Sequence, residues 1–171
     1  MEVIIGISKT RMTEEPLSVL PSSGQAVTMS VTVGLRTTRT TEFIDITEQV
    51  AAAVAEADLT EGLAVVSSPH TTCQVIINEA EDGFLRDLAR TLERLAPQDG
   101  SYEHDEAPHD LPDEEPNGYA HIRAALLSSP SVTIPIVDGK LSLGTWQRVF
   151  FVELDRARPR RFQVTVAGRS E

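Results

Sequence analysis

The stretch VTMSVTVGL at residues 27–35 places an apolar side chain at every second position. Successive side chains of an extended chain point to opposite faces, so the apolar residues share one face and the threonines and serine share the other. This alternation predicts a half-buried β-strand with one face on a core. We expect the threonine-rich stretch that follows, through Phe43 and Ile44, to pair with this strand.

Three helices are predicted between strand segments. Asp45 and Glu48 form a D-x-x-E capping box before a helix that ends near Gly62. A second helix begins at about Asp82, and Asn117 caps a third, short helix that runs through Leu127. The apolar stripes expected to face the core are Ile46, Val50, Val54 and Ala57 in the first helix, and Leu85, Leu88, Leu92 and Leu95 in the second.

The remaining segments have β character. Asp138-Gly139 is a strong signal for a hairpin turn between two short strands. The predicted strands are 63–67, 72–77, 132–137, 140–143, 146–154 and 162–166. Mostly antiparallel strands with helices packed against them define the α+β class. We therefore predict an antiparallel β-sandwich-like core with three helices packed against it.

The chain is expected to hold one domain. Residues 1–25 show no steady period and close with Pro-Ser-Ser-Gly, so we interpret them as an N-terminal extension ahead of a domain at 26–171. Residues 97–117 contain four prolines and many acids, which predicts a long loop. Long loops inside compact domains are usually functional or disordered.

Composition excludes several classes of function. The formal net charge of -11 argues against a nucleic-acid partner, which requires a basic surface. No apolar run approaches the roughly 20 residues of a membrane-spanning helix, and charged residues interrupt the N-terminus too early for a secretory signal. We expect a cytoplasmic protein without a membrane partner, and the single cysteine, Cys73, agrees with a reducing compartment.

The candidate chemistry lies with histidines in the middle of the chain. His70 falls between two predicted strands, His104 lies on the long loop, and His121 lies near the start of the third helix. Three imidazoles around a divalent ion leave one position open for water or substrate. The acids Glu79, Glu103 and Asp105 could then orient the rings.

Other interpretations of these residues stay open. The same histidines could act as general acids or bases, and the sequence has no close-spaced ligand pair such as H-x-x-x-H. We interpret Cys73 as a buried small hydrophobe rather than a nucleophile. Gly144-Thr145-Trp146-Gln147 is either a substrate contact or a bulge with a core tryptophan. Arg158, Arg160 and Arg161 suit phosphate or carboxylate unless they only solubilise a turn.

Taken in order, these segments resemble the YjbQ-like (UPF0047) family. The resemblance covers about residues 26–168, and the combination of motifs is specific although each piece is weak. The matching segments are Pro69-His70-Thr71-Thr72-Cys73, Ile77-Asn78-Glu79, Asp82, Tyr102-Glu103-His104-Asp105, Asn117-Gly118, Ala120-His121-Ile122, Gly144-Thr145-Trp146-Gln147 and Arg160-Arg161.

The resemblance implies a homotrimer and a pocket where His70, His104 and His121 converge around a divalent metal ion such as zinc. His109 falls outside the motif. The acids Glu79, Glu103 and Asp105 complete the expected catalytic set. The residues expected to contact substrate are Thr71, Asn78, Gly144, Thr145, Gln147, Arg160 and Arg161.

The family resemblance also implies a function. Members are described as having a secondary thiamine-phosphate synthase activity, which joins a pyrimidine diphosphate to a thiazole phosphate and releases pyrophosphate. We therefore expect a metal-dependent transferase that acts on a small phosphorylated heterocycle. A metal-assisted phosphatase or other hydrolase, and a non-catalytic trimer that binds a ligand or metal, are the alternatives.

Overall fold

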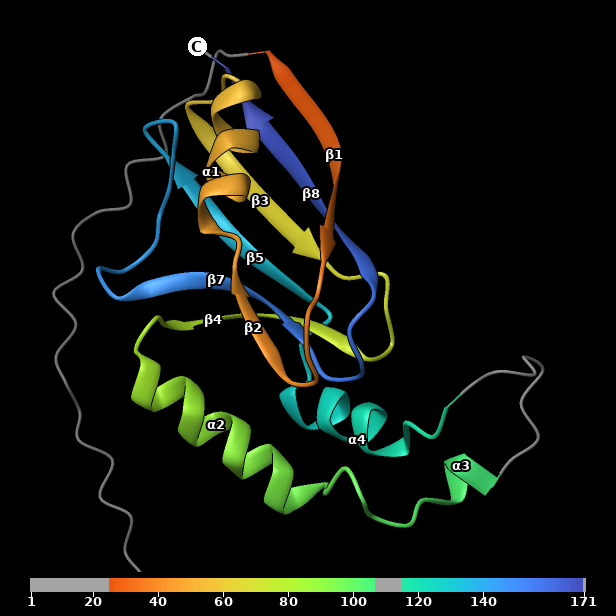
Figure 1. Cartoon of the computed structure of the whole chain (residues 1–171). Coiled ribbons are helices and arrows are strands. Elements are labelled where there is room, and N and C mark those ends of the chain that lie inside the picture. The colour runs from red at the N-terminus through yellow and green to blue at the C-terminus, as the bar shows by residue number, and fades with distance from the viewer. Residues whose placement is uncertain (1–24, 107–114, 171) are drawn as a thin grey trace, which may run out of the picture.

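A computed structural model describes residues 25–106 and 115–170 as two antiparallel sheets with helices on both sides (Figure 1). The predicted extension at 1–25 lies outside this range, apart from its last residue. The elements, in chain order, are β1 (Ala26–Arg36), β2 (Glu42–Asp45), α1 (Thr47–Glu56), β3 (Glu61–Ser67), β4 (Cys73–Glu79), α2 (Asp82–Leu95), α3 (Glu103–Glu106), α4 (Gly118–Leu127), β5 (Ser131–Val137), β6 (Lys140–Leu141), β7 (Gln147–Glu153) and β8 (Pro159–Arg169).

The strands separate into a five-stranded sheet of order β1-β8-β3-β5-β6 and a three-stranded sheet of order β2-β7-β4. The alternating stretch at 27–35 lies within β1, which confirms the predicted strand. Its neighbour is β8 rather than β2, because β2 pairs with β7 in the other sheet. The predicted pairing of residues 27–35 with Phe43 and Ile44 is therefore wrong, and the α+β class is confirmed.

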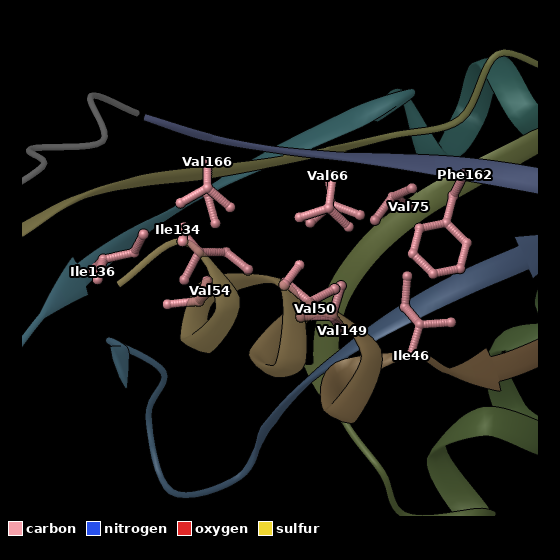
Figure 2. Close-up of a cluster of buried hydrophobic side chains, with 14 of the residues drawn as sticks. Ile46, Val50, Val54, Val66, Val75, Ile134, Ile136, Val149, Phe162 and Val166 are labelled. Atoms are coloured by element: carbon pink, nitrogen blue, oxygen red, sulfur yellow. The ribbon is translucent and has the colours of Figure 1, made fainter. Parts of the chain in front are cut away.

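The main core lies between α1, the five-stranded sheet and one face of the three-stranded sheet. Figure 2 shows Val50 and Val54 of α1 directed toward Val66, Ile134 and Val166 of the larger sheet. Ile46, directly before α1, lies near Phe162. The whole predicted stripe of this helix is buried, from Val50 at 0% exposure to Ala57 at 8%. Burying side chains of this size is the main stabilising contribution to such a fold.

A second core fills the opposite face of the three-stranded sheet, beneath which α2 and α4 lie in Figure 1. Strand β7 is covered on both faces, which is why Phe150, Phe151 and Val152 are all buried instead of alternating with exposed residues. Leu85, Leu88 and Leu92 of α2 face this core as predicted. Leu95 does not, because it lies at the helix end and is 62% exposed.

The ends of the helices differ from the predicted caps. The Asp45 carboxylate accepts the Thr47 backbone N–H (2.9 Å), so it precedes the N-cap, and Glu48 reaches Arg148 instead of closing a capping box. Helix α1 ends at Glu56 because Asp58 takes a positive φ of 50°, and Gly62 is already inside β3. Helix α3 forms within the segment that we predicted as a loop.

The hairpin at Asp138-Gly139 has the predicted turn. Asp138 (φ 50°) and Gly139 (φ 72°) both adopt the left-handed region that a two-residue turn of this type requires. The strand after the turn is shorter than predicted, since β6 ends at Leu141. Trp146 precedes β7 and is 73% exposed, which rules it out as a core residue. None of the helices in the two described ranges is long and apolar enough to span a membrane.

Candidate functional site

The turn that joins β3 to β4 carries His70, whose ring is half-buried. Its Nε2 accepts a hydrogen bond from the Arg161 backbone N–H (3.2 Å). Burial lowers the pKa of His70 below its usual value, and the nearby positive charge of Arg160 lowers it further. A ring nitrogen that accepts a hydrogen bond carries no proton, so the neutral ring keeps its proton on Nδ1.

A buried ion pair lies close to this turn. Glu153 ends β7 with 0% exposure, and its carboxylate accepts two hydrogen bonds from Arg160, from Nε (2.7 Å) and Nη2 (2.8 Å). The same Nη2 also donates to the Thr72 hydroxyl (3.0 Å), two residues after His70. Because both ends of the pair are fixed, the guanidinium holds the His70 turn against β8.

Cys73 packs beside this pair. It is fully buried, and its thiol lies 3.6 Å from a Glu153 carboxylate oxygen. Burial and the neighbouring carboxylate raise the pKa of the Cys73 thiol to about 12. Since the thiolate is the reactive form, this raised pKa disfavours Cys73 as a nucleophile, and its place in the hydrophobic core agrees with its interpretation as a small hydrophobe.

Helix α4 is held at its start by a carboxylate from α3. Asp105 accepts the backbone N–H groups of Asn117 (2.9 Å) and Gly118 (2.8 Å). Burial alone would raise the pKa of Asp105, but these two hydrogen bonds outweigh it and the pKa is lowered. Asp105 thus caps α4 in place of the Asn117 side chain, which makes no capping bond. It also lies 3.4 Å from His104 Nδ1.

His104 and His121 meet, with ring centroids 4.5 Å apart and planes tilted by 33°. His121 and His70 both line a pocket of about 230 Å³ that we call the histidine pocket. Its other lining residues are Pro69, Thr71, Thr72, Asn117, Asp155, Arg158 and Arg160. The fold therefore brings His70 and His121 to one cavity and places His104 next to His121.

Two buried polar atoms of lining residues lack a partner among the described residues. They are Oδ1 of Asn117, a residue with 4% exposure, and Nε of Arg158. Both side chains are held by Asp155, which accepts from Asn117 Nδ2 (3.2 Å) and from Arg158 Nη2. A buried polar group without a hydrogen bond costs free energy, so these two atoms are candidates for further hydrogen bonds.

Within the described residues of one chain, no group of three or more His, Cys, Asp or Glu side chains is placed to hold a metal ion. The Nε2 of His70 is engaged by Arg161, and two guanidinium groups line the same pocket. The single chain thus does not fit a three-histidine metal centre. Zinc stays a prediction from the family resemblance, and none of the chemistry proposed below depends on it.

Several residues predicted to contact substrate lie away from this pocket. Strands β4 and β7 run antiparallel, with Cys73 opposite Glu153 at one end and Glu79 opposite Gln147 at the other. Asn78 and Glu79 are therefore at the end remote from His70, as are Gly144, Thr145 and Gln147. Thr71 and Arg160 line the histidine pocket, Arg161 contributes its backbone N–H, and Glu103 is an exposed residue of α3.

Our sequence prediction missed three of the residues that shape the site. They are Asn117, Glu153 and Asp155, which line the pocket or fix its arginines. One signal was present: Glu153 follows the apolar run Val149 to Val152, and a carboxylate in a strand of this kind is almost never fully buried without a partner. No pattern in the sequence indicated that Asn117 would form a hydrogen bond with Asp155.

The fold and the site together define a class: an α+β protein of two antiparallel sheets with a small histidine- and arginine-lined pocket beside a β-turn. The family model for UPF0047 proteins of the YjbQ-like type matches residues 31–169. The chain therefore belongs to the YjbQ-like UPF0047 family.

Individual relatives agree with this membership. A UPF0047 protein of Archaeoglobus fulgidus is 43% identical over 127 residues, which cover 74% of this chain and 92% of that protein. The UPF0047 protein YugU of Bacillus subtilis is 33% identical over 141 residues, covering 82% and 100%. Each relative carries a family name and no named activity.

Solved structures show the same fold. A YbjQ-like protein of unknown function from Sulfolobus solfataricus superposes with a TM-score of 0.75 at 29% identity, covering 84% of this chain and 99% of that one. A hypothetical protein from Aeropyrum pernix gives 0.73 at 33% identity, covering 82% and 98%. In both comparisons almost the whole of the other chain is matched, and the unmatched residues belong mainly to this chain.

Proposed function

We propose that this chain is an enzyme that acts on a small phosphorylated substrate in the histidine pocket. The observation that carries the proposal is one cavity lined by two imidazoles and two guanidinium groups, those of His70, His121, Arg158 and Arg160. Hydrogen-bonding groups beside imidazole side chains are what a site needs to bind a polar molecule and move a proton on it.

The arginines that line the pocket, Arg158 and Arg160, would bind the phosphate group of the substrate. The guanidinium group of Arg158 lines the pocket, and its fork of N–H donors suits phosphate oxygens. Glu153 and Asp155 already balance the charges of Arg160 and Arg158, so directed hydrogen bonds, and not a large excess of positive charge, select the ligand. Asn117 also lines the pocket, and its amide group offers a hydrogen-bond partner to the substrate.

The histidines that line the pocket, His70 and His121, would transfer protons to or from the substrate. The lowered pKa of His70 keeps its ring neutral at pH 7, with the proton on Nδ1 and Nε2 fixed by Arg161. A neutral imidazole held in one tautomer serves as a general acid or base. His121, on the facing helix, is the second candidate for this role.

The particular reaction we propose is the thiamine-phosphate synthase activity implied by the family resemblance. A carbon–nitrogen bond forms between the pyrimidine methylene and the thiazole, the carbon–oxygen bond to the diphosphate breaks, and pyrophosphate leaves. Hydrogen bonds from Arg158 would stabilise the departing negative charge. We further propose the homotrimer implied by the same resemblance.

The test is an assay of the purified full chain with the pyrimidine diphosphate and the thiazole phosphate, following thiamine phosphate and pyrophosphate by chromatography. We expect equal amounts of both products, and a loss of at least about 100-fold in kcat/KM for His121→Ala and Arg158→Gln. Parallel samples with a chelator, together with elemental analysis, measure any dependence on metal.

The matched control is Thr133→Ala, an exposed position on β5 outside the pocket, which should retain full activity. Release of phosphate from simple esters without condensation would replace the synthase by a hydrolase. Saturable binding of both substrates without turnover would make the chain a binding protein. Turnover that is unchanged in both pocket variants would reject the histidine pocket as the active site.

A further inference from the structure

A second, larger cavity of about 610 Å³ opens between α2 and the segment that joins β1 to β2. Helix α4 separates it from the histidine pocket: His121 lines the smaller cavity, whereas Arg123 lines the larger one. Residues two positions apart on a helix face different sides, so one helix serves both cavities. A volume of this size is typical of a small-molecule site. We call it the α2 cavity.

The α2 cavity is basic although the chain is acidic. Its lining contains four arginines, Arg39, Arg86, Arg90 and Arg123, and only two acids, Asp82 and Glu93. The chain as a whole has a net charge of -11, so this concentration of positive charge runs against the composition. A cavity lined mainly by one sign of charge attracts ligands of the opposite sign.

The exposed arginines of the α2 cavity remain able to bind a ligand. Arg86 is paired with Asp82 at 3.9 Å, with both side chains at least 65% exposed, and Arg90 is paired with Asp87 in a similarly exposed position. Exposed ion pairs of this kind contribute little and exchange readily. Guanidinium groups so placed bind phosphate or carboxylate with paired hydrogen bonds.

The innermost arginine is built into the fold. Arg123 is 1% exposed and donates to the Ala96 carbonyl (2.9 Å), to the Thr41 hydroxyl (2.8 Å) and to Glu93. Thr41 adopts a φ of 53°, which is unusual for a β-branched residue, and the bond from Arg123 holds it there. Backbone strain of this kind persists where surrounding structure imposes it, often at binding sites.

The cavity also has an apolar part. Phe43, Leu85 and Ala89 belong to its lining and are only half-buried, so their side chains are available to a ligand. An aromatic ring and two aliphatic groups favour a flat apolar body, and the arginines favour an attached anionic group.

From these observations we propose that the α2 cavity binds a small molecule in which a flat apolar body carries a phosphate, phosphonate or carboxylate group. The site is separate from the histidine pocket and does not depend on the function proposed for it. Its ligand is defined by chemistry: an anionic head within reach of Arg39, Arg86 and Arg90, and a ring system against Phe43 and Leu85.

The test uses three probes on the full chain: 1-naphthylmethylphosphonate, which has no ester bond to hydrolyse, 1-naphthoate and neutral 1-naphthol. Calorimetric titration should show saturable binding of at least one anion and binding at least about tenfold weaker for naphthol. The double variant Arg86→Gln/Arg90→Gln should lose about tenfold or more in affinity. Ala89→Trp, which fills the cavity but keeps every charge, should also abolish binding.

The matched control is Arg94→Gln, an exposed arginine of the same helix outside the cavity lining, which should retain wild-type affinity. His121→Ala distinguishes the two cavities and should also leave binding unchanged. Binding that is equal for naphthol and the anions, or unchanged in the double variant, would overturn the proposal. So would the absence of saturable binding, or binding lost in His121→Ala but kept in Arg86→Gln/Arg90→Gln.

Discussion

Glu153 and Arg160 form a two-point ion pair in the interior, where the carboxylate has 0% exposure and the guanidinium side chain 6%. Glu153 lies on β7 of the smaller sheet and Arg160 on β8 of the larger one, so the pair joins the two sheets at the site. Thr37, directly after β1, donates a further hydrogen bond to Glu153 (3.1 Å). The pair thus connects the global fold to the histidine pocket.

Removing one partner of this pair should be severely destabilising. Glu153→Gln keeps the shape but leaves the Arg160 charge buried and uncompensated, which costs about 3–5 kcal/mol in the free energy of unfolding. Urea titration at fixed protein concentration measures the loss. The matched control is Arg148→Gln, which breaks the exposed pair with Asp45 and should shift the midpoint far less.

The double variant Glu153→Leu/Arg160→Met separates charge from packing. If the cost of the single change comes from an unpaired charge, removing both charges should restore part of the lost stability. A double variant as unstable as the sum of the two single variants would mean that the two side chains act independently.

The strands were predictable wherever one face alone is buried. The alternation at 27–35 and the Asp138-Gly139 turn both reappear in the structure, because side-chain period and turn geometry are local properties. The partner of β1 was not predictable in this way. It is β8, more than 120 positions further along the chain, and only the complete fold selects it.

The candidate site was predictable as a set of residue types but not as a geometry. His70 and His121 do share a pocket, and His104 contacts His121. Asp105, which we assigned to orienting a histidine, lies 3.4 Å from His104 Nδ1 but also has a role that the sequence did not indicate. Its main contacts are the first N–H groups of α4, and this role depends on a chain reversal between α3 and α4 that local patterns do not reveal.

Replacing Asp105 with alanine should loosen the start of α4 and cost about 1 kcal/mol, the usual value for a lost helix cap. The pKa of Asp105 is lowered in the folded chain, so its contribution is complete above the unfolded value of about 4 and is lost as the pH falls through the folded value. The difference in unfolding free energy between wild type and Asp105→Ala should therefore be constant above about pH 5 and shrink below about pH 4. If the difference in unfolding free energy stayed constant down to the folded pKa of Asp105, the ionised carboxylate would not be what stabilises the start of α4.

The pKa of His70 gives a prediction of the same kind with a different pH range. Its folded pKa is lowered, so the unfolded chain binds the proton more readily, and stability falls as the pH drops from about 6.5 through the folded value. His70→Gln lacks this titration and should lose less stability than wild type between pH 8 and pH 5. Urea titrations of both proteins at the two pH values measure the difference.

The cause of the His70 shift can be tested separately. Arg161→Gln removes a positive charge that lowers the pKa of His70 but keeps the backbone N–H that binds its ring. The pKa of His70, followed by the NMR signal of its ring Cε1–H, should rise in this variant. Arg94→Gln on α2 should leave it unchanged, and an equal pKa in wild type and Arg161→Gln would exclude the electrostatic contribution.

Two glycines of the larger sheet should respond oppositely to alanine. Gly168 on β8 lies directly opposite Gly62 on β3, and a Cβ at Gly168 would overlap the Glu61 carbonyl oxygen of the neighbouring backbone. The strands would have to separate locally, so Gly168→Ala should cost about 1–3 kcal/mol.

A Cβ at Gly34 on β1 meets nothing within 4 Å, and the φ of Gly34 is not in the left-handed region. Gly34→Ala should instead be neutral or stabilise by up to about 1 kcal/mol, because alanine restricts the unfolded chain. Urea midpoints of the two variants at equal protein concentration decide the matter, and a similar loss in both would show that close approach of β3 and β8 is not what requires glycine at position 168.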